Sequence, residues 1–196
     1  MPGRVHGSPL PAPLSDVDPA ESFLVRRAAA GDRSAFAALI EAHWSRLVRV
    51  ALSVVGEAEA EDSVQEALLR AWLALPSLRR PEAFAPWLTR VVLHGCFRAR
   101  RRRPETVPLA EAPEPAAALA PGAGLEVERL LAALAPRQRA VMHLTAVEGM
   151  SDGEIGAVME ITPAAVRSHR RRAREALSRL LAADAPAASS PREVLP

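Results

Sequence analysis

Six basic side chains are concentrated in the stretch TPAAVRSHRRRAREAL, which runs from Thr162 to Leu177 and holds five arginines and one histidine. A guanidinium group can hydrogen bond to phosphate oxygens or bridge O6 and N7 of guanine. Thr162 is a good helix N-cap, and Pro163 suits a first helical position because its missing N–H has no partner to lose. Since like charges on neighbouring turns are unfavourable without a polyanion, the stretch predicts a DNA-binding helix.

The two sides of this predicted helix differ in character. At 100° per residue one side is an apolar stripe that we expect to pack inward, formed by Val166, Ala173, Leu177 and Leu180. The other side and its flanks carry the residues expected to contact DNA, namely Thr162, Ala164, Arg167, Ser168, Arg171, Arg172 and Arg174. The alternative is that the arginines only solvate an exposed face, with Arg171 pairing with Glu175 four residues later.

The segment before this helix predicts how it is held. Ser151 and Glu154 form the S-x-x-E pattern of a capping box, which opens a short helix. A connection of three residues, 160–162, then leads into the basic helix. A short helix, a tight turn and a longer basic helix are the order of a helix-turn-helix.

A second charged segment has the opposite sign. Residues 57–66 hold five acids and no base, and apolar residues recur there at three or four positions until Pro76, namely Ala60, Val64, Leu68, Trp72 and Leu75. Turning this stripe inward leaves a charged patch with an apolar centre facing outward, formed by Glu61, Asp62, Gln65, Glu66 and Leu69. The patch suits a docking surface, although an ordinary solvated acidic face has a similar composition.

The rest of the 196-residue chain predicts an all-α protein of two small helical domains, since no alternating strand pattern is found. Asp32 can cap a helix that ends near Gly56, and a third helix begins near Pro86 and runs into arginines at 98 and 100–103. The predicted organisation is a tail over 1–20, a domain over 21–103, a flexible Pro/Ala-rich linker over 104–124, a helix-turn-helix domain over 125–183 and a tail over 184–196.

Chemistry of other kinds is not indicated. The sequence has no paired carboxylates, no nucleophile beside a base, no Gly-rich phosphate loop and no metal-ligand spacing, and Cys96 is its single cysteine. No apolar run reaches 18 residues. We therefore expect no catalytic activity, cofactor, metal, small-molecule substrate or membrane insertion, and a cytoplasmic location.

Two ordered motifs carry a family resemblance. AEDSVQEALLRAW (60–72) with FAPWLTRVV (84–92), followed by LAALAPRQRAVMHLTAVEGMSDGEIGAVMEITPAAVRSHRRRAREAL (131–177), resembles bacterial RNA polymerase sigma factors of the extracytoplasmic function (ECF) group. This resemblance implies a subunit that binds core RNA polymerase and directs promoter-specific initiation. By resemblance, the acidic helix binds the clamp helices of the largest catalytic subunit, and the basic helix enters the minus-thirty-five major groove.

The resemblance also implies a minus-ten surface and a regulator. The third helix and the loop 76–85 before it would meet the minus-ten element through Arg79, Arg80, Arg90, His94, Arg98 and Arg101, with residues 100–103 holding phosphates. Trp87 is expected in the core. An anti-sigma protein is a possible partner, as in many family members.

The chain departs from the family pattern at several positions. His94 replaces a frequent asparagine, Arg98 stands where Asn or Asp is usual, Gly156 replaces alanine, and MEIT (159–162) replaces the common LGIS. Two other functions stay open at this point. The helix-turn-helix also resembles that of dimeric LuxR-type transcriptional regulators, and a helical adaptor could use its arginines to bind an acidic protein.

Overall fold

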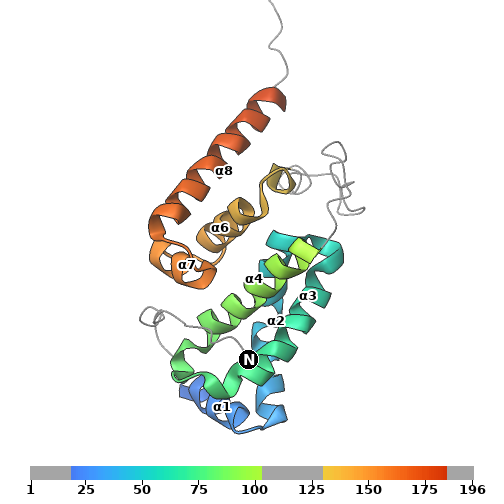
Figure 1. Cartoon of the computed structure of the whole chain (residues 1–196), viewed down its shortest axis with the longest axis vertical. Coiled ribbons are helices and arrows are strands. Elements are labelled where there is room, and N and C mark those ends of the chain that lie inside the picture. Colours follow the sequence, from blue (N-terminus) through green and yellow to red (C-terminus); the bar gives the residue numbers. More distant parts are fainter. Residues whose placement is uncertain (1–18, 103–129, 185–196) are drawn as a thin grey trace, which may run out of the picture.

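The computed structural model describes residues 19–102 and 130–184, and these are helices joined by turns, with no strand among them. The N-terminal part contains four helices and two short 3-10 turns (Figure 1), which are α1 (Pro19–Ala29), α2 (Arg33–Val55), α3 (Glu57–Ala74), η1 (Leu75–Ser77), η2 (Pro81–Ala83) and α4 (Phe84–Arg102). The C-terminal part contains α6 (Pro136–Ala146), α7 (Asp152–Met159) and α8 (Pro163–Asp184). The predicted all-α class is confirmed.

Helices α2, α3 and α4 pack side by side to form the N-terminal bundle, and α1 lies across one end (Figure 1). Its core includes Leu47 from α2, Val64 from α3 and Phe84 from α4, all of which are buried. Gly95 on α4 allows a close approach to α3, because a Cβ at this position would lie 3.2 Å from Cβ of Ala67. The low helix propensity of Gly95 is therefore offset by helix packing.

The start and end of α2 agree with the sequence prediction. The carboxylate of Asp32 accepts hydrogen bonds from the N–H groups of Ser34 and Ala35 at 2.9 and 3.1 Å. The Ser34 hydroxyl also donates to Asp32 Oδ1 at 2.6 Å, and this bond, followed by that from the Ala35 N–H, is the main cause that lowers the pKa of Asp32 to about 2. Gly56, with a φ of 85°, ends the helix.

Helix α1 was not predicted from the sequence. Residues 19 and 20, which we assigned to the N-terminal tail, are the first residues of α1, and the remaining tail residues lie outside the described part. The assignment is corrected because α1 buries Val25 and Ala28 against the bundle. The three-residue spacing of Val25 and Ala28 was too weak a signal to predict a helix next to a proline-rich stretch.

In the C-terminal part, α6, α7 and α8 pack around buried residues of their own. Leu144 of α6, Ile155 of α7 and Val166 of α8 are all buried. The spacing of Val141, Leu144 and Val147 predicts a helix that continues to Gly149. Helix α6 instead ends at Ala146, since the N–H of Val147 closes the last turn by bonding to the carbonyl of His143. Val147 is consequently exposed rather than part of the apolar stripe.

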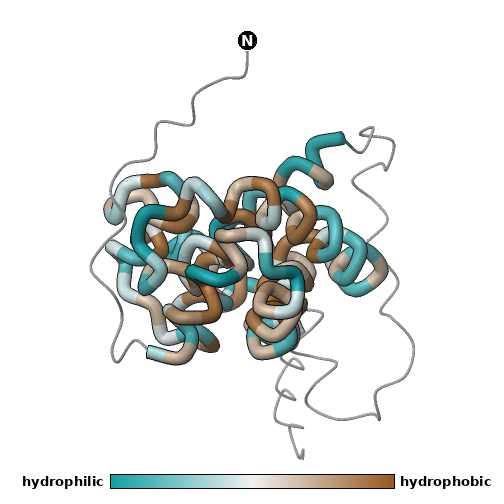
Figure 2. Tube along the Cα trace, turned by 90° about the horizontal axis from the view of Figure 1, so that it is seen from below, coloured by the Kyte–Doolittle hydropathy of each residue, from teal (hydrophilic) through white to brown (hydrophobic). Residues whose placement is uncertain are grey.

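The two parts are packed against each other in this structure. Helix α6 contacts α2 and α7 contacts α4, so that buried residues of both parts form one continuous apolar cluster. Along the tube in Figure 2, apolar and polar residues alternate within each helix, as expected for helices that bury one face. Residues 103–129, which include the predicted linker, lie outside the described part.

Candidate DNA- and partner-binding surfaces

The helix-turn-helix has both predicted caps. In α7 the Ser151 N–H donates to Glu154 Oε2 at 2.7 Å and the Glu154 N–H donates to Ser151 Oγ at 3.4 Å, which completes the capping box. In α8 the Oγ1 of Thr162 accepts from the Ala165 N–H at 3.1 Å. The turn between the helices is 160–162, as predicted.

The two sides of α8 are distributed as the 100° periodicity predicts. Val166 and Ala173 are buried, whereas Leu177 and Leu180 are half-buried. The predicted DNA-facing residues are exposed except Ser168, which is half-buried; the exposed ones are Thr162, Ala164, Arg167, Arg171, Arg172 and Arg174. The structure thus brings these side chains together along one face of the helix.

Ion pairs already occupy part of this basic face. Arg171 Nη1 donates to Glu175 Oε1 at 2.9 Å, which is the surface pair that the sequence suggested. Arg170, which is not among the residues predicted to contact DNA, donates through Nη1 and Nη2 to the two carboxylate oxygens of Asp152. Arg167 Nη1 lies 3.6 Å from Asp152 as well. The hydrogen bond from Arg170 is the main reason that the pKa of Asp152 is lowered.

The acidic patch on α3 is exposed as predicted. Glu61, Asp62, Gln65 and Glu66 are exposed, and Leu69 at the centre of the patch is 69% exposed. One residue was missed. Leu73 is 79% exposed and lies one turn beyond Leu69, so the two leucines share one face. Their spacing of four residues was the available signal.

Glu66 of this patch has ion-pair partners among residues 19–102. Its carboxylate accepts a hydrogen bond from Arg70, four residues later, and lies 3.6 Å from Arg102 Nη1 of α4. The negative charge at this edge of the patch is therefore partly neutralised.

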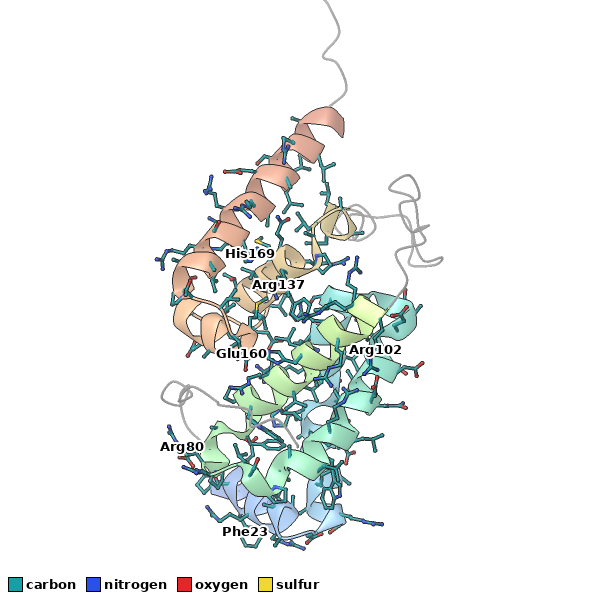
Figure 3. The ribbon with its side chains drawn as sticks, viewed as in Figure 1. Phe23, Arg80, Arg102, Arg137, Glu160 and His169 are labelled. Carbon is teal, nitrogen blue, oxygen red and sulfur yellow. The ribbon has the colours of Figure 1, made fainter. Side chains whose placement is uncertain are left out.

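The predicted minus-ten residues fall in three places rather than on one open surface. Arg79 and Arg80 are exposed before α4, and Arg80 Nε donates to Glu82 at 2.8 Å. Arg98 and Arg101 are exposed near the end of α4. Arg90 and His94 are half-buried and face the carboxylate of Glu160 in the C-terminal part. Figure 3 shows Arg80 far from Arg102 along the N-terminal part.

Trp87 and Cys96 belong to the packing of α4. The ring of Trp87 is half-buried, lies 5.9 Å from that of Phe84 and packs against the core, in agreement with the expectation from the sequence. Burial raises the pKa of the Cys96 thiol to about 12, so this group stays protonated.

Residues 19–102 and 130–184 offer neither a metal site nor a membrane-spanning helix. No group of three or more His, Cys, Asp or Glu side chains there could hold a metal ion. None of the helices there is long and apolar enough to cross a membrane.

Two family models match the chain. The model of sigma-70 region 2 matches residues 39–105, and that of sigma-70 region 4 matches residues 124–177. The first match does not support the LuxR-type alternative, since it covers most of the N-terminal part.

Individual relatives show the same similarity. The chain is 30% identical over 175 residues to the ECF RNA polymerase sigma-E factor of Escherichia coli (strain K12), which covers 80% of this chain and 92% of that protein. It is 32% identical over 162 residues to the probable RNA polymerase sigma factor RfaY of Xanthomonas campestris pv. campestris, covering 75% of this chain and 40% of that longer protein.

A solved structure extends the comparison to the fold. The structure of CnrH in complex with the cytosolic domain of CnrY has a TM-score of 0.64 and 32% identity, and the match covers 84% of this chain and 99% of CnrH. CnrH of Cupriavidus metallidurans is itself an RNA polymerase sigma factor. The order of the two regions, their similarity to sigma-E and the shared fold together show that the chain belongs to the ECF family of RNA polymerase sigma factors.

Proposed function

We propose that this sigma factor uses the exposed face of α3 to bind core RNA polymerase and the N-terminal half of α8 to read the minus-thirty-five element. The observation that carries the proposal is the separation of charge between these helices. Glu61, Asp62 and Leu69 are exposed on α3, whereas Arg171 and Arg172 are exposed on α8. A helix of this width fits the major groove of DNA with its N-terminal end toward the bases.

The minus-ten element is assigned to the loop before α4 and to α4 itself. Arg98 and Arg101 are exposed near the end of α4 and suit phosphate contacts, and Arg79 and Arg80 supply separate exposed positive charge in the loop. Capturing an unstacked base costs a few kcal/mol, and with no ATP this cost is met by binding energy from the polymerase and both promoter elements. The free chain should therefore bind closed promoter duplex weakly.

The remaining assignments follow from the family and from the described residues. The chain acts as a dissociable subunit of the polymerase in the cytoplasm and does not itself catalyse a reaction. Because CnrH was solved with the cytosolic domain of CnrY, we also assign an anti-sigma protein as a partner. The adaptor alternative would require an acidic protein ligand and no response to promoter DNA.

Paired variants test the division between the two surfaces. Arg171→Ala with Arg172→Ala should lower promoter-dependent run-off transcription at least about tenfold while sparing polymerase binding. Asp62→Ala with Gln65→Ala should weaken binding to core polymerase and leave the DNA-binding helix unchanged. Transcription and co-purification with core enzyme are the two measurements.

Matched controls use the same substitutions away from the surfaces. Arg179→Ala lies on α8 more than one turn beyond Arg174, and Glu41→Ala lies on an exposed part of α2. Both should behave as the unmodified chain. Equal loss of polymerase binding in the two paired variants would contradict the assignment.

A further inference from the structure

Glu160 has a backbone conformation that side chains avoid. Among the described residues it is the one non-glycine residue with a positive φ, and its φ of 55° and ψ of 46° place it in the left-handed region at the end of α7. Glycine is favoured at such helix ends because it has no Cβ. The sequence departs from its family here, with MEIT in place of LGIS. A side chain kept in this conformation indicates an interaction that offsets the strain.

The carboxylate of Glu160 makes that interaction with the other part of the molecule. Its Oε1 lies 3.2 Å from Arg90 Nη2 and its Oε2 lies 3.7 Å from His94 Nε2. Arg90 and His94 are one turn apart on α4 and face α7, and the Arg90 side chain is only 17% exposed. Figure 3 shows Glu160 at the boundary between the two parts. Glu160 thus joins the helix-turn-helix to α4.

Other contacts show that this boundary is packed. Arg46 Nε of α2 donates to Glu148 Oε2, and the Glu148 side chain is 7% exposed. The guanidinium of Arg137 on α6 lies 5.7 Å from the centre of the Phe97 ring on α4. Beside Glu160 the boundary opens into a cleft of about 480 Å³, whose lining includes four arginines, Arg98, Arg101, Arg102 and Arg137.

We propose that Glu160 holds the free chain in a closed form, in which its carboxylate occupies the place of a DNA phosphate at Arg90 and His94. The two parts must then separate before α4 can bind promoter DNA. This proposal rests on the assignment of Arg90 and His94 to minus-ten binding. In this closed form the turn of the helix-turn-helix covers the minus-ten residues Arg90 and His94 until polymerase and promoter displace it.

The cationic surroundings explain why a carboxylate is effective at this position. Burial is the main cause that lowers the pKa of His94; Glu160 raises this pKa, and Arg90, Arg98 and Arg101 lower it further. Without Glu160, Arg137 of the C-terminal part would face Arg98, Arg101 and Arg102 of α4 across the cleft with no carboxylate between them, which is unfavourable at low salt. The same carboxylate is exposed enough for salt to weaken its ion pairs.

Two substitutions separate the carboxylate from the backbone strain. Glu160→Gln removes the charge and keeps the side chain, whereas Glu160→Gly also removes the left-handed strain. Both should open the boundary, but only Glu160→Gly should make the turn itself easier to form. Glu175→Gln is the matched control, since it removes one charge from an exposed pair with Arg171 within α8.

The experiment measures the distance between the two parts of the full chain. Nitroxide labels are placed at E41C on α2 and S178C on α8, both at exposed positions. Distances between the labels are measured by double electron–electron resonance at low and high salt. Cys96 is buried and does not compete for the label. In parallel, the same variants without labels are titrated into a fluorescein-labelled single-stranded oligonucleotide.

We expect one short-distance population for the unmodified chain at low salt. Glu160→Gln and Glu160→Gly should raise the ratio of open to closed molecules about two- to fivefold and tighten oligonucleotide binding by a similar factor. Glu175→Gln should leave this ratio unchanged, and it should alter oligonucleotide binding no more than the loss of one exposed charge does. Unchanged distances in both Glu160 variants would overturn the proposal. Opening without tighter oligonucleotide binding would overturn the claim that the closed form keeps α4 from DNA. The proposed function is tested separately, by polymerase binding and run-off transcription.

Discussion

The carboxylate of Asp152 accepts hydrogen bonds from Nη1 and Nη2 of Arg170 at 2.6 and 3.2 Å. Asp152 is the first residue of α7, and Arg170 lies on α8 two turns after its start, so this pair fixes the two helices of the helix-turn-helix relative to each other. A two-bond arginine–carboxylate pair defines an orientation more narrowly than a single contact. Arg170 thereby positions α8 relative to α7.

The first prediction concerns this pair. Asp152→Asn and Arg170→Ala should each lower the affinity of the holoenzyme for a minus-thirty-five element, because α8 would be held less firmly. The double variant should be no weaker than the worse single variant, since both changes remove the same interaction. Binding to promoter DNA of fixed sequence measures the effect. Strictly additive losses would show that the two residues act independently.

The second prediction concerns Gly156, which stands where the family commonly has alanine. A Cβ at this position would lie 2.8 Å from the carbonyl oxygen of Ile161, closer than real Cβ contacts. Gly156→Ala should therefore destabilise the chain, because a strain of about 1 to 3 kcal/mol outweighs the gain in helix propensity. Thermal unfolding measures the loss.

Gly153 provides the control for this substitution. It lies on the same helix, and its added Cβ would meet Ser151 Oγ only at 3.9 Å. Gly153→Ala should leave the melting temperature unchanged or raise it slightly. A similar response of both variants would mean that the approach of Ile161 does not limit this position.

The third prediction concerns the exposed leucines of α3. Leu69→Ala with Leu73→Ala should weaken binding to core polymerase about 10- to 100-fold, as expected when two apolar side chains at the centre of an interface are truncated. The free energy of unfolding should change little, because both side chains are exposed in the free chain. Phe23→Ala removes another exposed apolar side chain, on α1, and should leave polymerase binding unchanged. An equal effect of Phe23→Ala would contradict the location of the surface.

The fourth prediction concerns pH and His143 of α6. Burial is the main cause that lowers the pKa of His143 below 6.5; Arg49 and Arg46 lower it further, and Glu148 raises it. Because the unfolded chain then binds a proton more readily, the stability contributed by neutral His143 is present above pH 6.5 and is lost as pH falls through the folded-state pKa.

His143→Gln should make the free energy of unfolding less dependent on pH between about pH 7.5 and 5. The slope should fall by an amount that corresponds to at most one bound proton. Urea unfolding at a series of pH values measures the slope. His94 and His169 also have lowered pKa values through burial, so part of the slope should remain in the variant. An unchanged slope would mean that His143 has no part in it.

Local features of this protein were predictable from the sequence. The caps at Asp32, Ser151 and Thr162 were found because each cap involves residues within three positions of one another. The exposed acidic patch of α3 and the basic face of α8 followed from the 3.6-residue period, which places side chains on a helix without reference to its neighbours. The family, and with it the function, followed from the order of two long motifs.

The boundaries of some helices and the ion-pair partners of single arginines were less predictable from the sequence. Helix α1 was missed because its signal is two small buried residues, and the end of α6 was misplaced because Val147 lies in a turn that the apolar pattern cannot distinguish from a helix. Arg170 and Arg171 have the same side chain and are adjacent in sequence. One pairs with Asp152 on α7 and the other with Glu175 on its own helix.

The sequence by itself determined that the chain is helical, which face of α3 and α8 is exposed, and to which family it belongs. Only the tertiary structure decided that the two parts pack against each other, and that Glu160 faces Arg90 and His94. The reason is physical. Helix caps and helix faces depend on residues a few positions apart, whereas the contact of Arg46 with Glu148 joins residues 102 positions apart and forms only when α2 and α6 meet.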